Sequence, residues 1–150
     1  MESTDAQILA LLSGDGRMSF TDIGKATGLS TSAAQQRVRR LEQRGVITGY
    51  RAVINPESLG KVLTAFISLR VVNPAEDDDI SGRLETIDGI VSCYSIAGRA
   101  SYLLMVQVAK PADLEALLNQ IRQSASVTTE TTLVLSVPFA DRPLTPEDDD

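Results

Sequence analysis

Hydroxyl, amide and arginine side chains are concentrated in one short stretch of the chain, residues 30–44. Ala34, Val38 and Leu41 recur within it at helical spacing, so a helix would turn these residues inward and its polar residues outward. Amides and arginines on such a face can hydrogen-bond base edges in a DNA major groove, while longer basic side chains reach phosphates. The predicted DNA-contact residues are Ser30, Thr31, Ser32, Gln35, Gln36, Arg37, Arg39 and Arg40.

The two ends of this helix are expected to act differently. The hydroxyls of residues 30–32 lie at the positive end of a helix dipole, which is a natural seat for a phosphate. We expect Gln36 to read bases and Arg39 to anchor the phosphate backbone. The alternative is that the outward face only meets solvent, as the polar faces of most amphipathic helices do.

Two further helices are expected to precede this one. Capping patterns at Thr4 and Ser19 begin stretches in which apolar residues recur at helical spacing. Residues 13–16 end the first stretch, and Gly28 lies where the second would end in a left-handed residue. A short helix, a glycine turn and a polar helix match helix-turn-helix geometry, which favours DNA binding over a purely structural three-helix unit.

The charge distribution supports this interpretation. The 150-residue chain has a net charge of -6, yet residues 1–55 carry seven basic and five acidic residues, which leaves -8 for the remainder. Phosphate binding depends on local positive potential. From residue 30 to residue 51, Glu42 is the only acid against five arginines. The pattern favours a DNA-facing module joined to a part with another role.

The chain contains no histidine and a single cysteine, Cys93. Lack of histidine removes the commonest general base and the usual activator of serine and cysteine nucleophiles, so an enzyme is the least favoured alternative. Cys93 is expected to be a small packing residue rather than a redox sensor. Because there is no signal-peptide pattern, no possible internal disulfide and no apolar run near the ~20 residues that span a bilayer, we expect a cytoplasmic protein without a membrane partner.

The rest of the chain alternates between the strand and the helix periodicity. An extended segment over 46–54 should follow the DNA-reading helix. The order strand, helix, strand, strand, helix, strand is the ferredoxin-like βαββαβ arrangement, an α+β fold with both helices on one face of the sheet. Its other face is apolar and needs a partner, so a twofold dimer is expected. The predicted elements are strands at 63–72, 90–97, 101–108 and 127–137, with helices around 80–87 and 111–121.

Several local sequences together are similar to the Lrp/AsnC (leucine-responsive and asparagine regulator) family of prokaryotic transcription factors. They are Thr4–Leu12, Gly28–Ser30, Arg37–Glu42, Arg44–Tyr50 and Asn55–Pro56. The resemblance covers nearly the whole chain up to its acidic tail. It implies a winged helix-turn-helix joined to a ferredoxin-like domain that senses amino acids, with homodimers that commonly assemble to octamers.

By this resemblance, the effector lies between dimers, near the predicted hairpin whose local sequence is Ala97–Tyr102. Backbone amides freed by Gly98 could hold an amino-acid carboxylate. Many family members carry an acid where this chain has Ser101, and Arg99 adds positive charge. A plain hairpin loop is the alternative. The predicted effector-binding residues are Gly98, Arg99, Ala100, Ser101, Tyr102, Thr132, Val134 and Ser136.

The resulting expectation is a sequence-specific DNA-binding regulator whose oligomeric arrangement responds to a small effector, an amino acid. An architectural DNA-organising protein without an effector is the alternative. No metal is predicted, because a solvated run at a helix start explains the acids of residues 76–79 more simply than a hard-cation site. The expected domains are residues 1–50 (winged helix-turn-helix), 51–61 (strand and linker), 62–140 (ferredoxin-like, effector-binding and oligomerising) and 141–150 (acidic disordered tail).

Overall fold

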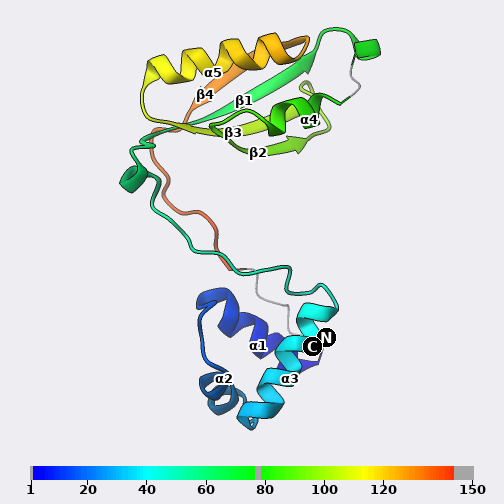
Figure 1. The fold of residues 1–150 in the computed structure, drawn as a ribbon, viewed down its shortest axis with the longest axis vertical. Coiled ribbons are helices and arrows are strands. Elements are labelled where there is room, and N and C mark those ends of the chain that lie inside the picture. The colour runs from blue at the N-terminus through cyan, green and yellow to red at the C-terminus, as the bar shows by residue number, and fades with distance from the viewer. Residues whose placement is uncertain (1, 77–78, 144–150) are drawn as a thin grey trace. The chain divides into compact units, whose positions relative to one another are not determined.

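The computed structural model describes residues 2–76 and 79–143, which divide into two compact units (Figure 1). Residues 2–53 and 139–143 belong to the first unit, and Ile54–Pro138 form the second. Most of the predicted acidic tail and part of the acidic run at 76–79 lie outside the described residues. Within the described ranges, no helix is long and apolar enough to cross a membrane.

Helices α1 (Ser3–Gly14), α2 (Phe20–Thr27) and α3 (Thr31–Gln43) pack together in the first unit. The inward face predicted for α3 is confirmed, because Ala34, Val38 and Leu41 are almost completely buried. They share a core with Ile8 of α1 and Ile23 of α2. The apolar spacing in the sequence therefore fixes which face of α3 remains outside.

Caps and a glycine contact set the junction between α2 and α3. The Ser19 and Ser30 hydroxyls each accept a hydrogen bond from a backbone N–H of the helix that follows, both at 3.1 Å. Gly28 ends α2 with φ +72°, the left-handed conformation that glycine adopts without a steric penalty. A Cβ on Gly24 would lie 2.6 Å from the Leu29 carbonyl oxygen. The two helices therefore meet through a backbone approach that requires glycine.

Two expectations for this unit are wrong. Thr4 does not cap α1, because the helix already begins at Ser3 and its N-cap position, Glu2, makes no side-chain cap hydrogen bond. Among the described residues, no strand occupies the predicted 51–61 strand and linker, where the structure has instead a 3-10 turn at Pro56–Leu59. β-Branched residues favour strands only where a neighbouring strand pairs with them, and Val53 is 90% exposed with none.

The second unit is an antiparallel sheet in the order β2-β3-β1-β4, with α4 and α5 packed into one core on the same face (Figure 1). This confirms the predicted βαββαβ order. The elements are β1 (Leu63–Val71), α4 (Ile80–Glu85), β2 (Ile90–Ser95), β3 (Tyr102–Val108), α5 (Pro111–Ser124) and β4 (Val127–Leu133), with a second 3-10 turn at Pro74–Glu76.

Alternation along the central strands places their apolar residues under the helices. Ala65, Ile67 and Leu69 of β1 are fully buried, and they share one core with apolar residues of β3, α4 and α5. The intervening residues of β1 and β3 face the opposite side of the sheet, which we call the open face. Its half-buried apolar residues are Phe66, Leu103 and Met105.

The strands next to the predicted effector residues are shorter than expected. β4 ends at Leu133 rather than residue 137, because its register with β1 reaches the first residues of that strand there. One more hydrogen bond follows, from Val134 N to Thr64 O at 3.0 Å, and Leu135 is then 96% exposed. β2 ends at Ser95 and β3 begins at Tyr102, so the connection between them spans residues 96–101.

Candidate nucleic-acid interface and ligand pockets

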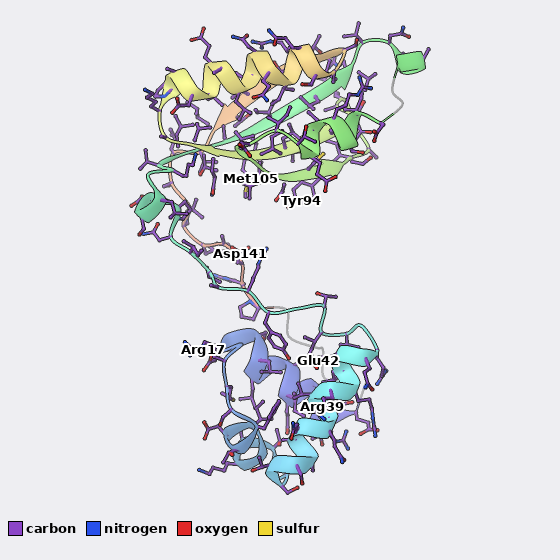
Figure 2. All side chains as sticks on the ribbon, in the orientation of Figure 1. Arg17, Arg39, Glu42, Tyr94, Met105 and Asp141 are labelled. Atoms are coloured by element: carbon purple, nitrogen blue, oxygen red, sulfur yellow. The ribbon has the colours of Figure 1, made fainter. Side chains whose placement is uncertain are left out.

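The outward face of α3 carries polar side chains that the rest of the first unit does not engage. Gln36, Arg39 and Arg40 are exposed, and none of them makes a side-chain hydrogen bond or ion pair with a described residue. Figure 2 labels Arg39 on this helix. Gln35 is half-buried at the flank of the face, as its helical position predicts. Unpaired amides and guanidinium groups on one helix face are available to a nucleic acid.

The hydroxyl groups predicted to bind a phosphate at the start of α3 also make hydrogen bonds within the protein. The Ser30 hydroxyl caps the N–H of Ala33 and lies 3.2 Å from the Ser32 hydroxyl. Thr31 donates its hydroxyl to Thr21 Oγ1 of α2 at 3.4 Å. Ser30, Thr31 and Ser32 are nevertheless exposed at the positive end of the helix dipole. These hydroxyls therefore hold the turn while remaining accessible to an anion.

Arg37 has a different role from the one predicted. Its Nη1 donates to Asp5 Oδ1 of α1 at 2.8 Å and also contacts the Glu2 carboxylate. Hydrogen bonds to Glu2, then to Asp5, raise the pKa of Arg37 above its already high usual value. Because Asp5 is only 5% exposed, its carboxylate depends on this partner. Arg37 therefore joins α3 to α1, and we remove it from the proposed DNA-contact set.

The single acid of α3, Glu42, is also engaged by the protein. Tyr50 donates its phenolic O–H to Glu42 Oε1 at 2.8 Å. Partial burial, then the hydrogen bond to Glu42, raises the pKa of Tyr50 to about 12. This contact ties the chain that follows α3 back onto the helix. The sequence analysis missed it because a residue in an irregular segment has no periodicity from which its partner can be predicted.

The hairpin between β2 and β3 borders a cavity of about 260 Å³. Of the predicted effector residues, only Arg99 and Ala100 line it. Gly98 and Ser101 adjoin these two in the same connection, and the Ser101 N–H bonds to the Leu69 carbonyl at 2.8 Å. Tyr102 packs against the core of the second unit. The hairpin is thus attached to β1 by its backbone.

Thr132, Val134 and Ser136 do not contribute to this cavity. Thr132 pairs with Phe66, and Val134 bonds to Thr64, so both lie toward the beginning of β1, whereas the cavity lies toward its end. The antiparallel register of β4 causes this separation. The structure therefore does not bring the predicted effector residues together, and the grouping of these three with the hairpin is corrected.

The cavity is completed by residues that the sequence analysis missed. Arg70 and Ser68 come from β1, and Arg70 Nε donates to the Arg99 carbonyl at 3.3 Å. Glu130, which pairs with Ser68 in the sheet register, comes from β4 together with its neighbours Thr128 and Thr129. The sequence did contain a signal, which is a charged residue within each strand. Arg70 is the only charged residue in a strand of apolar and hydroxyl residues, and Glu130 interrupts a run of threonines.

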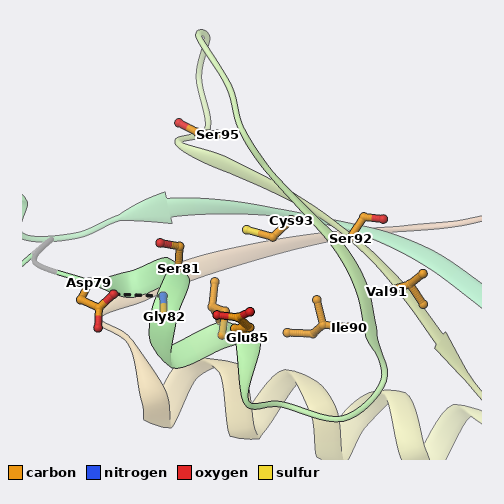
Figure 3. Close-up of a pocket in the computed structure, with 10 residues that line it drawn as sticks. Asp79, Ser81, Gly82, Glu85, Ile90, Val91, Ser92, Cys93 and Ser95 are labelled. Carbon is orange, nitrogen blue, oxygen red and sulfur yellow. Dashed lines mark hydrogen bonds between the residues drawn. The ribbon is translucent and has the colours of Figure 1, made fainter. Parts of the chain in front are cut away.

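A larger hollow of about 590 Å³ lies between α4 and the edge strand β2 (Figure 3). It is lined by two carboxylates, Asp79 and Glu85, and by no basic side chain among the described residues. Asp79 Oδ1 accepts a hydrogen bond from the Gly82 N–H at 3.2 Å, the dashed line in the figure. Within the described ranges, no cluster of three metal-ligating side chains is present. The described residues that line the hollow therefore offer no positively charged side chain to bind the carboxylate of a ligand.

Cys93 lines this hollow and is exposed, so the prediction of a packing residue is wrong. It lies on β2, at the edge of the sheet, where α4 does not cover it. Partial burial raises the pKa of the Cys93 thiol. The thiol therefore remains protonated at neutral pH, and a reactive thiolate is not favoured.

Two family models match the chain. Residues 1–42 match the AsnC-type helix-turn-helix domain, and residues 64–144 match the Lrp/AsnC ligand binding domain. The HTH-type transcriptional regulator LrpA of Mycobacterium tuberculosis is 44% identical over 142 residues, which is 95% of each chain. The leucine-responsive regulatory protein of Haemophilus influenzae is 34% identical over 79% of this chain and 72% of its own.

A solved structure is similar over almost the full length. The feast or famine regulatory protein from M. tuberculosis, complexed with L-methionine, superposes with a TM-score of 0.93 at 44% sequence identity. The match covers 97% of this chain and 99% of that one. The helical unit and the sheet unit are therefore both found in regulators of known structure.

Proposed function

The chain belongs to the Lrp/AsnC family of transcription regulators, and from this premise we propose that it binds specific DNA sequences in an oligomeric arrangement that responds to an amino acid. Like its relatives, it is a transcription regulator and not an enzyme. The observation that carries the DNA proposal is the outward face of α3, where Gln36, Arg39 and Arg40 are exposed without partners among the described residues.

The side chains of this face differ in length and charge, and therefore in the part of the DNA that each can contact. Gln36 lies nearer the start of α3 and has an amide suited to base edges, whereas Arg39 and Arg40 have the length and charge for phosphates. Ser30, Thr31, Ser32 and Gln35 complete the proposed contact set. In a twofold dimer, paired α3 helices address half-sites one helical turn apart, about 34–36 Å, or a multiple of that.

An amino acid is the proposed effector, and no metal or other cofactor is proposed. The M. tuberculosis regulator of known structure carries L-methionine, and the ligand-binding family model covers the sheet unit. The hairpin cavity supports this proposal, because it combines backbone groups, hydroxyls and side chains of both charges. The volume of about 260 Å³ lies just below the ~300–1,000 Å³ of drug-sized ligand sites, which suits a smaller metabolite.

Dimers that assemble to octamers are the proposed oligomers. The open face carries Phe66 and Met105 as direct partners in the sheet register, with Leu103 on the next row. Tyr94 on β2, 53% exposed, extends this apolar surface, and Figure 2 shows Tyr94 and Met105 on the side of the sheet away from α5. An apolar sheet face that no helix covers is stabilised when a second copy covers it.

The proposed domains remain residues 1–50 for DNA, 62–140 for effector and assembly, 51–61 between them and 141–150 as an acidic tail. A cytoplasmic location follows from a DNA target. In this arrangement, the part of net positive charge faces the DNA, and the acidic part of the chain controls assembly.

The deciding experiment is calorimetry of the full chain against all common amino acids, with the mass of the assembly measured in each case. We expect at least one amino acid to bind and to change the assembly mass or the affinity for operator DNA. DNA binding that remains intact while no amino acid binds would favour an architectural protein.

Gln36→Ala should relax base preference. An equal loss of affinity for specific and for random DNA would argue against base reading by Gln36.

A further inference from the structure

The second half of α3 carries positive charge that the described part of the protein does not neutralise. Arg39 and Arg40 are exposed on its outward face, and the exposed Arg44 follows at the end of the helix. None of the three makes an ion pair or a side-chain hydrogen bond with a described residue. Arg40 and Arg44 are four positions apart, a spacing at which like charges on a helix repel one another. An anion that lies along this surface would therefore stabilise it.

A run of acids follows directly after a segment of the same unit. Residues 139–143 belong to the first unit, and the next seven residues, which lie outside the described ranges, contain four acids and no base. The acids are Glu147, Asp148, Asp149 and Asp150. The only base from residue 139 onward is Arg142, whose guanidinium lies over the Phe139 ring at 4.0 Å from the centroid. The acidic tail therefore has far more negative charge than its own segment can balance.

The length of this acidic segment is comparable to that of α3. Seven residues reach at most about 25 Å when extended, and the 13 residues of α3 span about 20 Å. Because residue 143 is already part of the first unit, a short connection holds the acids near the arginines. Such a connection gives an effective concentration in the millimolar range, at which ion pairs that are individually weak can form together.

We propose that the acidic tail docks on the outward face of α3 in its own chain, where its carboxylates bind Arg39, Arg40 and Arg44 and compete with DNA phosphates. A carboxylate and a phosphate offer a guanidinium the same kind of charge-assisted hydrogen bond. The inference rests on the proposed DNA contact of α3 and adds a segment that limits it. DNA displaces the tail because a duplex presents many more charges than four carboxylates.

The first test compares DNA affinities with and without the charges of the tail. The tail-neutral variant combines Glu147→Gln, Asp148→Asn, Asp149→Asn and Asp150→Asn. At low salt it should bind a duplex of random sequence about 5–10-fold more tightly than the unaltered protein does, if each of about three exposed ion pairs doubles the docked population. Salt screens these pairs, so the two affinities should converge as salt is raised. Equal affinities at low salt would overturn the inference.

Matched variants separate docking from general repulsion between acids and DNA. One control removes four exposed acids of the second unit and should change the affinity for the same duplex by less than about 2-fold. It combines Glu57→Gln, Glu85→Gln, Asp88→Asn and Glu115→Gln. In an Arg39→Gln/Arg40→Gln background, neutralising the tail should also have an effect below about 2-fold, because the docking partners are absent. A gain that stays at about 5–10-fold in this background would overturn docking in favour of repulsion.

A second test locates the tail in the absence of DNA. A carbodiimide joins a carboxylate to an amine with which it is in contact, and Arg40→Lys places an amine at the proposed docking position while keeping its charge. We expect peptides that join position 40 to residues 147–150, in a species with the mass of one chain, and addition of the duplex should suppress them. Lys25, exposed on α2 of the same unit, is the internal control and should couple only at background level.

The outcomes of the coupling test distinguish this inference from the proposed function. Absence of coupling at position 40, or equal coupling at Lys25, would overturn the docking even if DNA binds normally. Links between two chains would overturn the assignment to the tail of the same chain. If position 40 couples to the tail but no form of the protein binds DNA, the docking stands and the proposed DNA-binding function fails.

Discussion

Replacement of Gly24 by alanine tests whether a backbone contact fixes the spacing of α2 and α3. Alanine normally stabilises a helix interior by about 1 kcal/mol relative to glycine. Here, a Cβ would lie 2.6 Å from the Leu29 carbonyl oxygen and 3.4 Å from the Ser30 carbonyl carbon, both backbone atoms. The Leu29 N–H also bonds to the Gly24 carbonyl at 2.9 Å, so the turn cannot retreat without straining that bond. Overpacking costs about 1–3 kcal/mol, and a contact as short as this one belongs at the upper end of that range, where it outweighs the propensity gain by about 2 kcal/mol.

The assay is urea unfolding of the full chain, followed by its helical circular dichroism. Gly24→Ala should lower the midpoint of the first unit by about 1 M, given m-values of ~1–3 kcal/mol/M. Gly14→Ala is the matched control, because a Cβ at the end of α1 would have nothing within 4 Å. The control should be as stable as the unaltered protein or up to ~1 kcal/mol more stable. Equal stability of the two variants would refute the argument from close approach.

Three further perturbations address the helix face and its anchors. Arg39→Ala should weaken binding to all DNA sequences similarly and reduce the salt slope by about 1, so an unchanged slope would contradict a phosphate contact. Arg37→Ala should lower the thermal midpoint because Asp5 loses its partner, whereas Arg40→Ala should leave the midpoint unchanged; equal midpoints would argue against the anchor role. The pKa of Tyr50 is raised from 10.0 to about 12 by burial, then by Glu42, so its contribution to stability is full below pH 10 and is lost as pH rises through about 12. Spectrophotometric titration should show an ionisation near pH 12 that Tyr50→Phe removes, and its persistence in that variant would refute the assignment to Tyr50.

Helix faces and strand order were predictable because they depend on local periodicity. The inward-facing residues of α3 and the alternately buried residues of β1 were both predicted correctly. A period of 3.6 residues in a helix and of 2 in a strand can be recognised within a few residues of sequence. The helix caps at Ser19 and Ser30 were equally local. The Thr4 pattern failed because the N-cap position is Glu2, two residues earlier, a difference that short capping motifs cannot resolve.

Contacts between distant residues were not predictable in the same way. The Arg37–Asp5 pair joins residues 32 positions apart, and the sequence shows Arg37 only as one more arginine in a basic run. The cavity depends on the register of β4 against β1, which places Glu130 beside Ser68 and moves Thr132 toward the other end of the strand. A slip of two residues would keep the same faces and change every partner, so the local alternation of apolar residues cannot specify that geometry.

The division of the chain constrains how an effector can act. The cavity residues Arg70 and Glu130 belong to one compact unit, and the exposed arginines of α3 belong to the other. A ligand changes DNA binding only if it binds the possible arrangements of the assembly with different affinities. Because such coupling is reciprocal, operator DNA must change the affinity for the amino acid by the same factor, typically about 5–150-fold. Calorimetry of the amino acid with and without operator DNA therefore measures the coupling directly, and identical affinities would leave the two units thermodynamically independent.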